Sequence, residues 1–210
     1  KKKIKARILN YIVTKVLKFI PLGKIIVQNN DDFKWLESIG INNLQIKLIR
    51  GSGVNTSKFK PPLSSEKKNI FIVLIARMLW DKGINEFVQA ANILKQSYPK
   101  VKFILIGDPD YANPSSITSK QLNKWVKNDN IEWHGHKKNI SSILKKCSIA
   151  CLPSYREGLP KFLIEAMACG LPIVTTNVPG CRELVSENQN GYLVPPYEYT
   201  ALANALEKLI

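Results

Sequence analysis

The sequence is poor in the residues that build metal centres and disulfide frameworks. Its 210 residues include two histidines and four cysteines, and no two cysteines form a C-x-x-C pair. A zinc site is therefore not expected. The cysteines lie in or beside apolar runs, which favours buried free thiols in a reducing compartment. They are Cys147, Cys151, Cys169 and Cys181.

Apolar runs long enough to cross a bilayer are missing as well. The segment 3–20 has the apolar periodicity of a helix, but it is too short and too charged to span a membrane. It also lacks the small-residue cleavage site of a signal peptide, and a cytoplasmic location is expected. The favoured interpretation of this segment is a core helix of a larger domain. The alternative is a basic amphipathic helix, peripheral on the inner face of the membrane.

Acidic residues are scarce in the first third of the chain. Residues 1–68 hold fifteen Lys/Arg and four Asp/Glu, a net charge of +11 out of +15 for the whole sequence. A basic surface attracts nucleic acid, anionic lipid or phosphorylated substrates. The sequence has no nucleic-acid motif and no interleaving of aromatic with basic residues, so nucleic acid is not an expected partner. An anionic acceptor or an anionic membrane surface fits the charge better.

From residue 69 onward, apolar strands alternate regularly with helical segments. Strands are expected at 70–76, 101–106, 131–133, 148–152, 173–175 and 191–194, and helices at 84–97, 119–128, 140–146, 161–169, 181–186 and 200–209. This alternation indicates a parallel sheet, and near-continuous apolar strands fit a sheet buried on both faces. The fold class is therefore α/β, a Rossmann-like parallel sheet of about six strands flanked by helices.

The first fifty residues form a separate pattern. Short strands at 24–28 and 44–49 flank a helix at 33–38. Gly51-Ser52-Gly53 and Pro61-Pro62 are typical of a linker, which we place at 51–68, before a second domain at 69–210. The chain begins with Lys rather than Met, so we expect it to be a piece of a longer protein.

In a parallel α/β sheet, ligands bind at the carboxyl ends of the strands, and every candidate residue follows a strand. Arg77 and Lys82 come after the first strand of the sheet, before a helix N-terminus. They suit a diphosphate, because Arg binds phosphate oxygens in bidentate fashion and Lys as a point charge. The alternative is a pair of solvated surface cations. Gly107, after the second strand, would let a ligand approach the backbone, or is an ordinary turn glycine.

Two carboxylates stand out between the fourth and fifth strands. Glu157 lies in the loop and Glu165 about one turn into the next helix, so both can point toward the helix N-terminus. That end suits a phosphate. Pro160 has no N–H, so the donors would be the amides of Lys161 and Phe162. An acid beside a phosphate site commonly holds sugar hydroxyls, and this outlines a sugar-nucleotide site. The alternatives are a solvated loop acid and an exposed helix acid.

A loop with two histidines, His134–Lys137, follows the third strand. It is placed to edge a nucleotide base, although loop histidines are more often surface residues.

The segment from Glu157 to Val174 resembles the E-x7-E signature of retaining glycosyltransferases with the GT-B fold, family 4. Arg77-x4-Lys82 resembles that family's phosphate-binding pair. Val178–Val185 and Asn190–Val194 resemble the segments that follow the signature.

The resemblance extends to the region between the two expected domains. Arg50–Asn55 resembles the interdomain segment of the family, which usually has Asp where Asn55 stands. Residues 1–49 resemble the end of the N-terminal acceptor domain, so residues 1–50 would be a remnant of that domain. The chain would then hold one half of a GT-B fold, the half that binds the donor.

The resemblance also implies roles for individual residues. Arg77 and Lys82 would neutralise the diphosphate, Glu165 would bind the ribose, and Glu157 would be the catalytic residue that holds the transferred sugar. The residues expected to bind the donor are Arg77, Lys82, Gly107, Lys137, Gly158, Leu159, Lys161, Phe162 and Glu165.

The implied function is retaining glycosyl transfer in surface polysaccharide or glycan biosynthesis, with a UDP-sugar as donor and no metal or other cofactor. A glycan or lipid-linked acceptor would bind through the N-terminal domain, most of which lies outside this chain. The chain alone is therefore expected to bind nucleotide but to transfer sugar poorly or not at all. The alternatives are a GT-B epimerase or phosphorylase, and a non-catalytic basic module that docks on membranes.

Overall fold

A computed structural model describes residues 11–17, 23–62, 69–127 and 129–210. The chain divides into two compact units, Lys1–Ser52 and Gly53–Ile210. Of the helix expected at 3–20, residues 11–17 are helical, and the rest lies outside the described residues. None of the helices in the described segments is long and apolar enough to cross a membrane.

The first unit contains two short parallel strands and a helix. Strands β1 (Ile25–Val27) and β2 (Ile46–Leu48) pair with Ile25 opposite Ile46, and α2 (Asn30–Ser38) connects them. The side chain of Asn29 caps α2 by accepting a hydrogen bond from the Asp32 N–H at 2.8 Å, as its position before two acids predicts. The apolar residues of these elements make a small core of their own.

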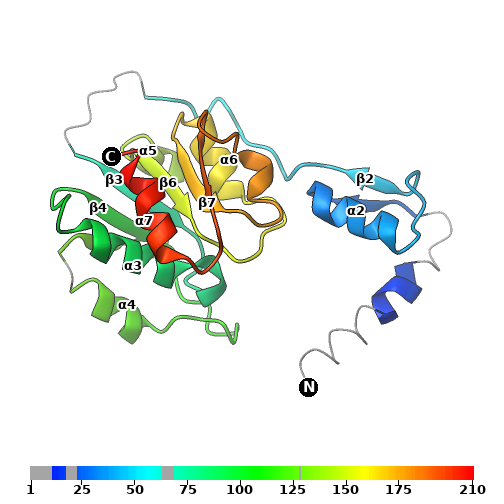
Figure 1. The fold of residues 1–210 in the computed structure, drawn as a ribbon, viewed down its shortest axis with the longest axis horizontal. Coiled ribbons are helices and arrows are strands. Elements are labelled where there is room, and N and C mark those ends of the chain that lie inside the picture. Colours follow the sequence, from blue (N-terminus) through cyan, green and yellow to red (C-terminus); the bar gives the residue numbers. More distant parts are fainter. Residues whose placement is uncertain (1–10, 18–22, 63–68, 128) are drawn as a thin grey trace. The chain divides into compact units, whose positions relative to one another are not determined.

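The second unit is built on a six-stranded parallel sheet, which confirms the predicted fold class (Figure 1). Its strands lie in the order β5-β4-β3-β6-β7-β8. They are β3 (Phe71–Ile75), β4 (Lys102–Ile106), β5 (Ile131–Trp133), β6 (Ile149–Leu152), β7 (Ile173–Thr176) and β8 (Gly191–Val194). The chain starts at the centre in β3, winds outward to β5, and returns to β6 on the other side of β3. The sheet therefore has a topological switch point between β3 and β6.

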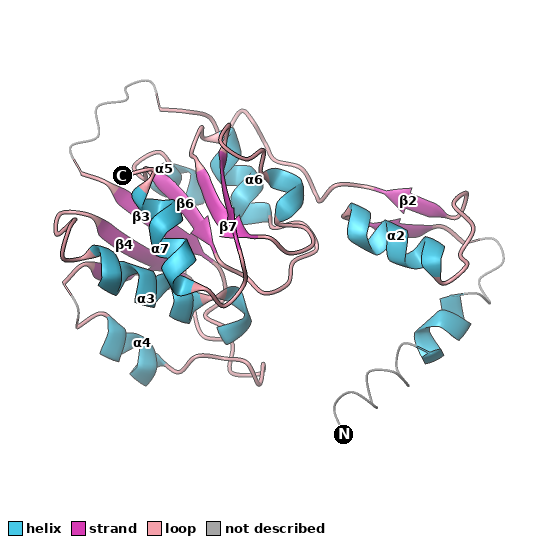
Figure 2. Ribbon diagram, viewed as in Figure 1, coloured by secondary structure: helices cyan, strands magenta, loops and turns pink. Residues whose placement is uncertain are grey.

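Helices cover both faces of this sheet (Figure 2). The helices are α3 (Ile84–Leu94), α4 (Ser119–Trp125), α5 (Ile140–Leu144), α6 (Lys161–Ala168) and α7 (Tyr199–Glu207). Helices α3 and α7 pack side by side on one face, and α5 and α6 lie on the other (Figure 1). Because both faces are covered, residues of the central strands such as Ile72, Val73 and Leu74 are fully buried.

Two elements end differently from the sequence expectation, and each difference has a local cause. Helix α3 stops at Leu94 rather than at residue 97, where Tyr98-Pro99 follows. Residues 95–97 continue as turns, and the Tyr98 N–H still donates to the Leu94 carbonyl at 2.8 Å before Pro99 ends the pattern. The helix expected at 181–186 is only a 3-10 turn, Arg182–Leu184, because the Asn190 side chain accepts the Ser186 N–H at 2.8 Å and ends the turn.

Part of the expected linker packs against the second unit. The side chain of Phe59 is buried in the core of that unit, and Pro61 lies against Gly170 at the end of α6. An apolar residue inside a turn-rich segment thus anchors the segment to the sheet domain.

Candidate functional site

The candidate site lies at the carboxyl ends of β3 and β6, the two strands that flank the switch point. The loop after β3 and the loop after β6 are joined directly through Asp81. Its carbonyl oxygen accepts the Tyr155 N–H at 2.9 Å and the Ser154 hydroxyl at 3.1 Å. The connections on either side of a switch point diverge to opposite faces of the sheet, which leaves a crevice for ligands.

Two glycines allow three loops to meet at this point. Gly83 has a φ of +70°, and a Cβ atom on it would overlap the carbonyl oxygen of Pro153. Gly180, in the loop after β7, has a φ of +79°, and its Cβ would overlap the carbonyl oxygen of Gly158. Only glycine takes this backbone geometry at so close an approach without strain. The loop after β6, which carries Glu157, is therefore in close backbone contact with the loops after β3 and β7.

An ion pair links the two principal motifs. Lys82 Nζ lies 2.6 Å from Glu157 Oε1, and the two side chains are only 20% and 13% exposed. The residues are 75 positions apart in the sequence, so only the fold brings them together. The interpretation of Lys82 as a solvated cation and of Glu157 as a solvated loop acid is wrong. Both are half-enclosed groups that face one another at the sheet edge.

Arg77 has a different environment from Lys82, although both lie in the same loop. Its Nη1 lies 2.6 Å from Asp110 Oδ2, in the loop after β4, and its side chain is 60% exposed. The guanidinium is therefore turned toward β4 and solvent. The alternative interpretation of Arg77 as a surface cation agrees with this exposure. The positive charge of Arg77 is nevertheless paired with the carboxylate of Asp110.

Glu165 is enclosed, as its apolar neighbours in the sequence suggested. Its side chain is 12% exposed, and Oε1 lies 3.8 Å from Lys161 Nζ. Burial raises the pKa of Glu165 above its ordinary value, and the positive charges of Lys161 and Lys58 oppose this rise. The alternative interpretation as an exposed helix acid is wrong. Pro160 gives α6 no side-chain cap, so the amides of Lys161 and Phe162 open the helix without one.

A cavity of about 370 Å³ lies at the carboxyl ends of β3 and β4. It collects three of the predicted residues, Arg77, Gly107 and Lys137, from three separate loops. Gly107 has a φ of +134°, and a Cβ there would overlap the carbonyl oxygen of Ala76. This glycine is thus required by the packing of the chain on itself. Lys82 and Glu157 pair with each other and do not line this cavity.

The histidine loop is tied to the neighbouring strands. The backbone N–H of His136 donates to Asp108 Oδ1 at 3.0 Å, and the Trp133 indole N–H donates to the Gly107 carbonyl at 2.8 Å. His134 Nε2 lies 2.8 Å from Glu132 Oε2. His136 lines the cavity, whereas His134 has a carboxylate partner outside it.

Two carboxylates at the cavity are not among the predicted site residues. Asp108 and Asp110 form a D-x-D triplet directly after β4, and both line the cavity. This triplet at a predicted strand end was the signal that could have identified them. Each already has a protein partner, Asp108 the His136 N–H and Asp110 the Arg77 guanidinium. Within the described segments, no cluster of three or more His, Cys, Asp or Glu residues could hold a metal ion.

All four cysteines are buried, and their predicted burial as free thiols is confirmed. Cys181 is close enough to feel the charges of Glu157 and Lys82, and burial raises the pKa of its thiol to about 11. It is therefore a neutral thiol at neutral pH.

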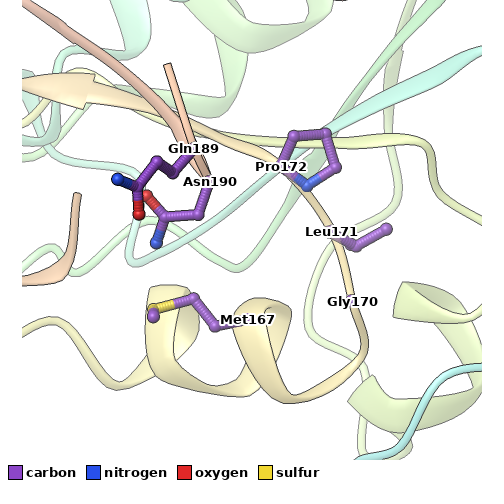
Figure 3. A pocket seen from close by; sticks show the side chains of 6 residues that line it. All are labelled: Met167, Gly170, Leu171, Pro172, Gln189 and Asn190. Atoms are coloured by element: carbon purple, nitrogen blue, oxygen red, sulfur yellow. The ribbon is translucent and has the colours of Figure 1, made fainter. Parts of the chain in front are cut away.

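A second cavity, of about 300 Å³, lies at the opposite edge of the sheet (Figure 3). Met167 on α6 lies across it from Gln189 and Asn190, and Pro172 comes just before β7. The Asn190 amide is occupied within the loop, since it accepts from the Ser186 N–H and donates to the Leu184 carbonyl, each at 2.8 Å. None of the predicted site residues lines this cavity, and we assign it no role.

Comparison with known proteins places this geometry in a family. An N,N'-diacetylbacillosaminyl-diphospho-undecaprenol alpha-1,3-N-acetylgalactosaminyltransferase from Campylobacter jejuni is 32% identical over 201 residues, which are 89% of this chain and 51% of that protein. A UDP-Gal:alpha-D-GlcNAc-diphosphoundecaprenol alpha-1,3-galactosyltransferase from Escherichia coli is 26% identical over 200 residues, 88% of this chain and 50% of that protein.

The fold has a close counterpart among solved structures. The crystal structure of HepE from Anabaena in complex with UDP and glucose superposes with a TM-score of 0.75 at 22% identity, covering 89% of this chain and 53% of that one. The predicted GT-B architecture is thereby confirmed. This chain spans about half the length of the curated relatives described above.

The named relatives are glycosyltransferases, which favours the transferase prediction over an epimerase, a phosphorylase or a docking module. The family described as glycosyl transferases group 1 matches residues 55–210, well over half of the sequence. The similarity to the family is thus not confined to the Arg77-x4-Lys82 and E-x7-E segments, because the matched region includes both of them and the sheet between. The chain belongs to the group 1 glycosyl transferases.

Proposed function

We propose that this chain is the donor-binding half of a retaining glycosyltransferase that takes its sugar from a UDP-sugar. The observation that carries the proposal is the 2.6 Å pair between Lys82 and Glu157, which unites the two motif loops at the switch point. A cation for a diphosphate and a carboxylate for sugar hydroxyls are the two functional groups that a sugar nucleotide requires side by side. The HepE complex with UDP and glucose, on the same fold, supports this choice of ligand.

In this proposal Lys82 and Arg77 bind the diphosphate and stabilise the charge that develops on it as the sugar leaves. Both cations pair with carboxylates in the structure, Lys82 with Glu157 and Arg77 with Asp110. The arriving diphosphate would compete with these acids for the cations. In this proposal the positive charges of Lys82 and Arg77 take the place of a metal ion at this step.

Glu165 and Glu157 would hold the two sugars of the donor. Glu165, enclosed beside the start of α6, is assigned to the ribose hydroxyls. Glu157 is assigned to the transferred sugar, near its anomeric carbon. During transfer the bond from that carbon to the phosphate oxygen breaks, the acceptor oxygen bonds to the carbon on the same face, and the acceptor proton passes to the departing phosphate.

The acceptor would bind to the part of the enzyme that precedes the donor domain. We assign residues 1–50 to the end of an acceptor domain, residues 51–68 to the connection, and residues 69–210 to the donor domain. The Campylobacter and Escherichia coli relatives are both named for acceptors linked to undecaprenol diphosphate. We therefore propose a polyprenyl-diphosphate-linked glycan as acceptor, at the cytoplasmic face of a membrane, in the biosynthesis of a surface polysaccharide or related glycan.

The proposal is tested by calorimetric titration of the chain with UDP, GDP and ADP. UDP is expected to bind, and Lys82→Ala, Arg77→Ala and Glu165→Ala are each expected to weaken it. Lys124→Ala, on the exposed surface of α4, is the matched control and should leave the affinity unchanged. If the folded wild-type chain binds none of the three nucleotides, the proposal fails.

A further inference from the structure

A buried hydroxyl lies where the two motif loops meet. Ser154, two residues after the end of β6, is fully buried. Its Oγ atom lies 3.1 Å from the carbonyl oxygen of Asp81 and 3.3 Å from that of Arg156. Asp81 immediately precedes Lys82, and Arg156 immediately precedes Glu157. One side chain therefore contacts the backbone on the N-terminal side of both members of the ion pair.

The contact between Ser154 and Asp81 joins distant parts of the sequence. Serine hydroxyls commonly bond to backbone groups of their own turn, whereas Ser154 reaches a carbonyl 73 positions away. The same carbonyl also accepts the Tyr155 N–H at 2.9 Å. Two consecutive residues of the loop after β6 thus donate to a single oxygen of the loop after β3. Because Asp81 lies in the 3-10 turn Trp80–Lys82, these bonds join the loop that carries Glu157 to the turn that carries Lys82.

A third strand holds the backbone of Ser154. Thr175 and Thr176 are the last two residues of β7, and both are buried although they carry hydroxyls. The Thr176 hydroxyl donates to the carbonyl of Ser154 itself, and the Thr175 hydroxyl donates to the Leu152 carbonyl at 2.6 Å. Loss of either bond would leave a buried polar group without a partner, which costs stability. The bonds from Thr176 to Ser154 and from Ser154 to Asp81 therefore connect β7 with the loops after β6 and β3.

We propose that Ser154 is a positioning residue for the Lys82–Glu157 pair, and that Thr176 holds Ser154 in place for this role. The Ser154 hydroxyl sets the spacing of the two backbone segments, and with it the distance at which the amine and the carboxylate meet. A diphosphate that competes for Lys82 would open the ion pair, whereas the buried hydroxyl bond involves neither charged group and would keep the loops together. The role of the pair toward a donor rests on the proposed function. The positioning itself rests on contacts within the chain.

The neighbouring threonine supplies a matched control for this role. Thr175 and Ser154 each have a buried hydroxyl that donates to a backbone carbonyl, that of Leu152 for the first and that of Asp81 for the second. The bond of Thr175 joins β7 to β6 within the sheet rather than between the motif loops. Thr175→Val and Ser154→Ala each remove one such bond, so both should lower the melting temperature. Only Ser154→Ala should also loosen the contact between the two loops.

Two measurements on the chain without nucleotide test the proposal. The first is the acetylation rate of the Lys82 amine, measured by mass spectrometry with Lys124 as internal reference. The second is the hydrogen-exchange rate of the Tyr155 amide, measured by NMR. In Ser154→Ala we expect both rates to rise by about fivefold, the scale of one neutral hydrogen bond. In Thr175→Val neither rate should change.

Two variants at Thr176 separate positioning from loss of the fold. Thr176→Ser keeps the hydroxyl and should leave both rates near those of the wild type, whereas Thr176→Val keeps the shape without the hydroxyl and should raise both rates, as Ser154→Ala does. The proposal is overturned if Ser154→Ala and Thr175→Val change the Lys82 rate equally, or if Thr176→Ser and Thr176→Val do. A wild-type chain that binds no UDP would defeat the proposed function instead, while these two rates would still decide the positioning role.

Discussion

Two ion pairs at the same sheet edge have the same length but different environments. Lys82–Glu157 and Arg77–Asp110 both measure 2.6 Å, yet the first pair is 20% and 13% exposed and the second 60% and 29%. Water screens the exposed pair, so the attraction between its charges contributes little. In the enclosed pair each charge depends on the other, because neither is well hydrated. The two pairs therefore differ in burial rather than in distance. We expect the enclosed Lys82–Glu157 pair to hold its geometry and the exposed Arg77–Asp110 pair to exchange partners more easily.

The largest difference between the pairs should appear when each acid becomes an amide. We expect Glu157→Gln to lower the rate of sugar transfer by the full-length protein by about 100-fold, the scale of one preorganised polar contact at a reacting centre. Asp110→Asn should change that rate by less than about threefold, because its pair is exposed. Transfer from a panel of UDP-sugars would measure both. If Glu157→Gln and Asp110→Asn lower the transfer rate equally, the difference in burial between the two ion pairs has no effect on function.

Removal of each cation sharpens the same comparison at the level of binding. Lys82→Ala is expected to weaken UDP binding by about 10- to 100-fold, the scale of a charge-assisted hydrogen bond. It should also lower the melting temperature, because Glu157 would be left enclosed without a partner. Arg77→Ala should weaken UDP binding less and leave the melting temperature unchanged. Calorimetry and thermal unfolding measure these effects, and a larger loss for Arg77→Ala would contradict the ranking.

Breaking the exposed Arg77–Asp110 pair is expected to increase the affinity for UDP. Asp110→Asn frees Arg77 from its carboxylate, so UDP should bind up to about five times more tightly at low salt, matching the energy of a surface ion pair. The gain should disappear at about 1 M salt, where charges are screened within a few ångströms. Titrations at both salt concentrations test this. If Asp110→Asn weakens UDP binding at low salt, Asp110 contributes to the nucleotide site in another way.

The smallest expected effect concerns the pH dependence of stability at Glu165. Burial raises the pKa of this group in the folded chain, so the folded state holds its proton more tightly than the unfolded state does. Stability therefore falls as pH rises through the interval between the ordinary pKa and the raised one. Glu165→Gln should be slightly more stable than the wild type at pH 7. Chemical unfolding at several pH values measures the difference.

Low pH supplies the control for that prediction. Below the ordinary pKa of a glutamate the wild-type side chain is neutral in both states, so the advantage of Glu165→Gln should vanish there. An advantage that persists or grows at low pH would mean that the charge of Glu165 is not its cause.

The sequence predicted the elements of the sheet better than their order. Short, mostly apolar runs identify buried strands, and all six strands lie within one residue of the expected bounds. The pairing of β6 with β3 is a long-range contact between strands that look alike, so no local pattern specifies it. Yet this pairing is what brings Lys82 to Glu157. The motifs therefore named Lys82 and Glu157 without showing that the two side chains meet.

The residues that sequence reasoning overlooked are acids with unusual surroundings. Asp110 looks like any polar loop residue, and its contact with Arg77 depends on how two loops fold toward each other. Glu86 looks like an ordinary solvated acid at a helix N-terminus, where negative charge is favourable. In the folded chain its side chain is nevertheless only 6% exposed. Such surroundings are invisible in a single sequence because burial depends on the far end of the chain.

The burial of every cysteine has a practical consequence for studying motion. A thiol-reactive fluorophore would find no accessible native sulfur, since all four thiols are enclosed in the second unit. Leu44 in the first unit and Tyr111 in the second are 74% and 70% exposed. Leu44→Cys with Tyr111→Cys would therefore accept a donor and an acceptor dye without removal of any native cysteine. Energy transfer between the dyes would then report, molecule by molecule, whether the two units change their separation when UDP is added.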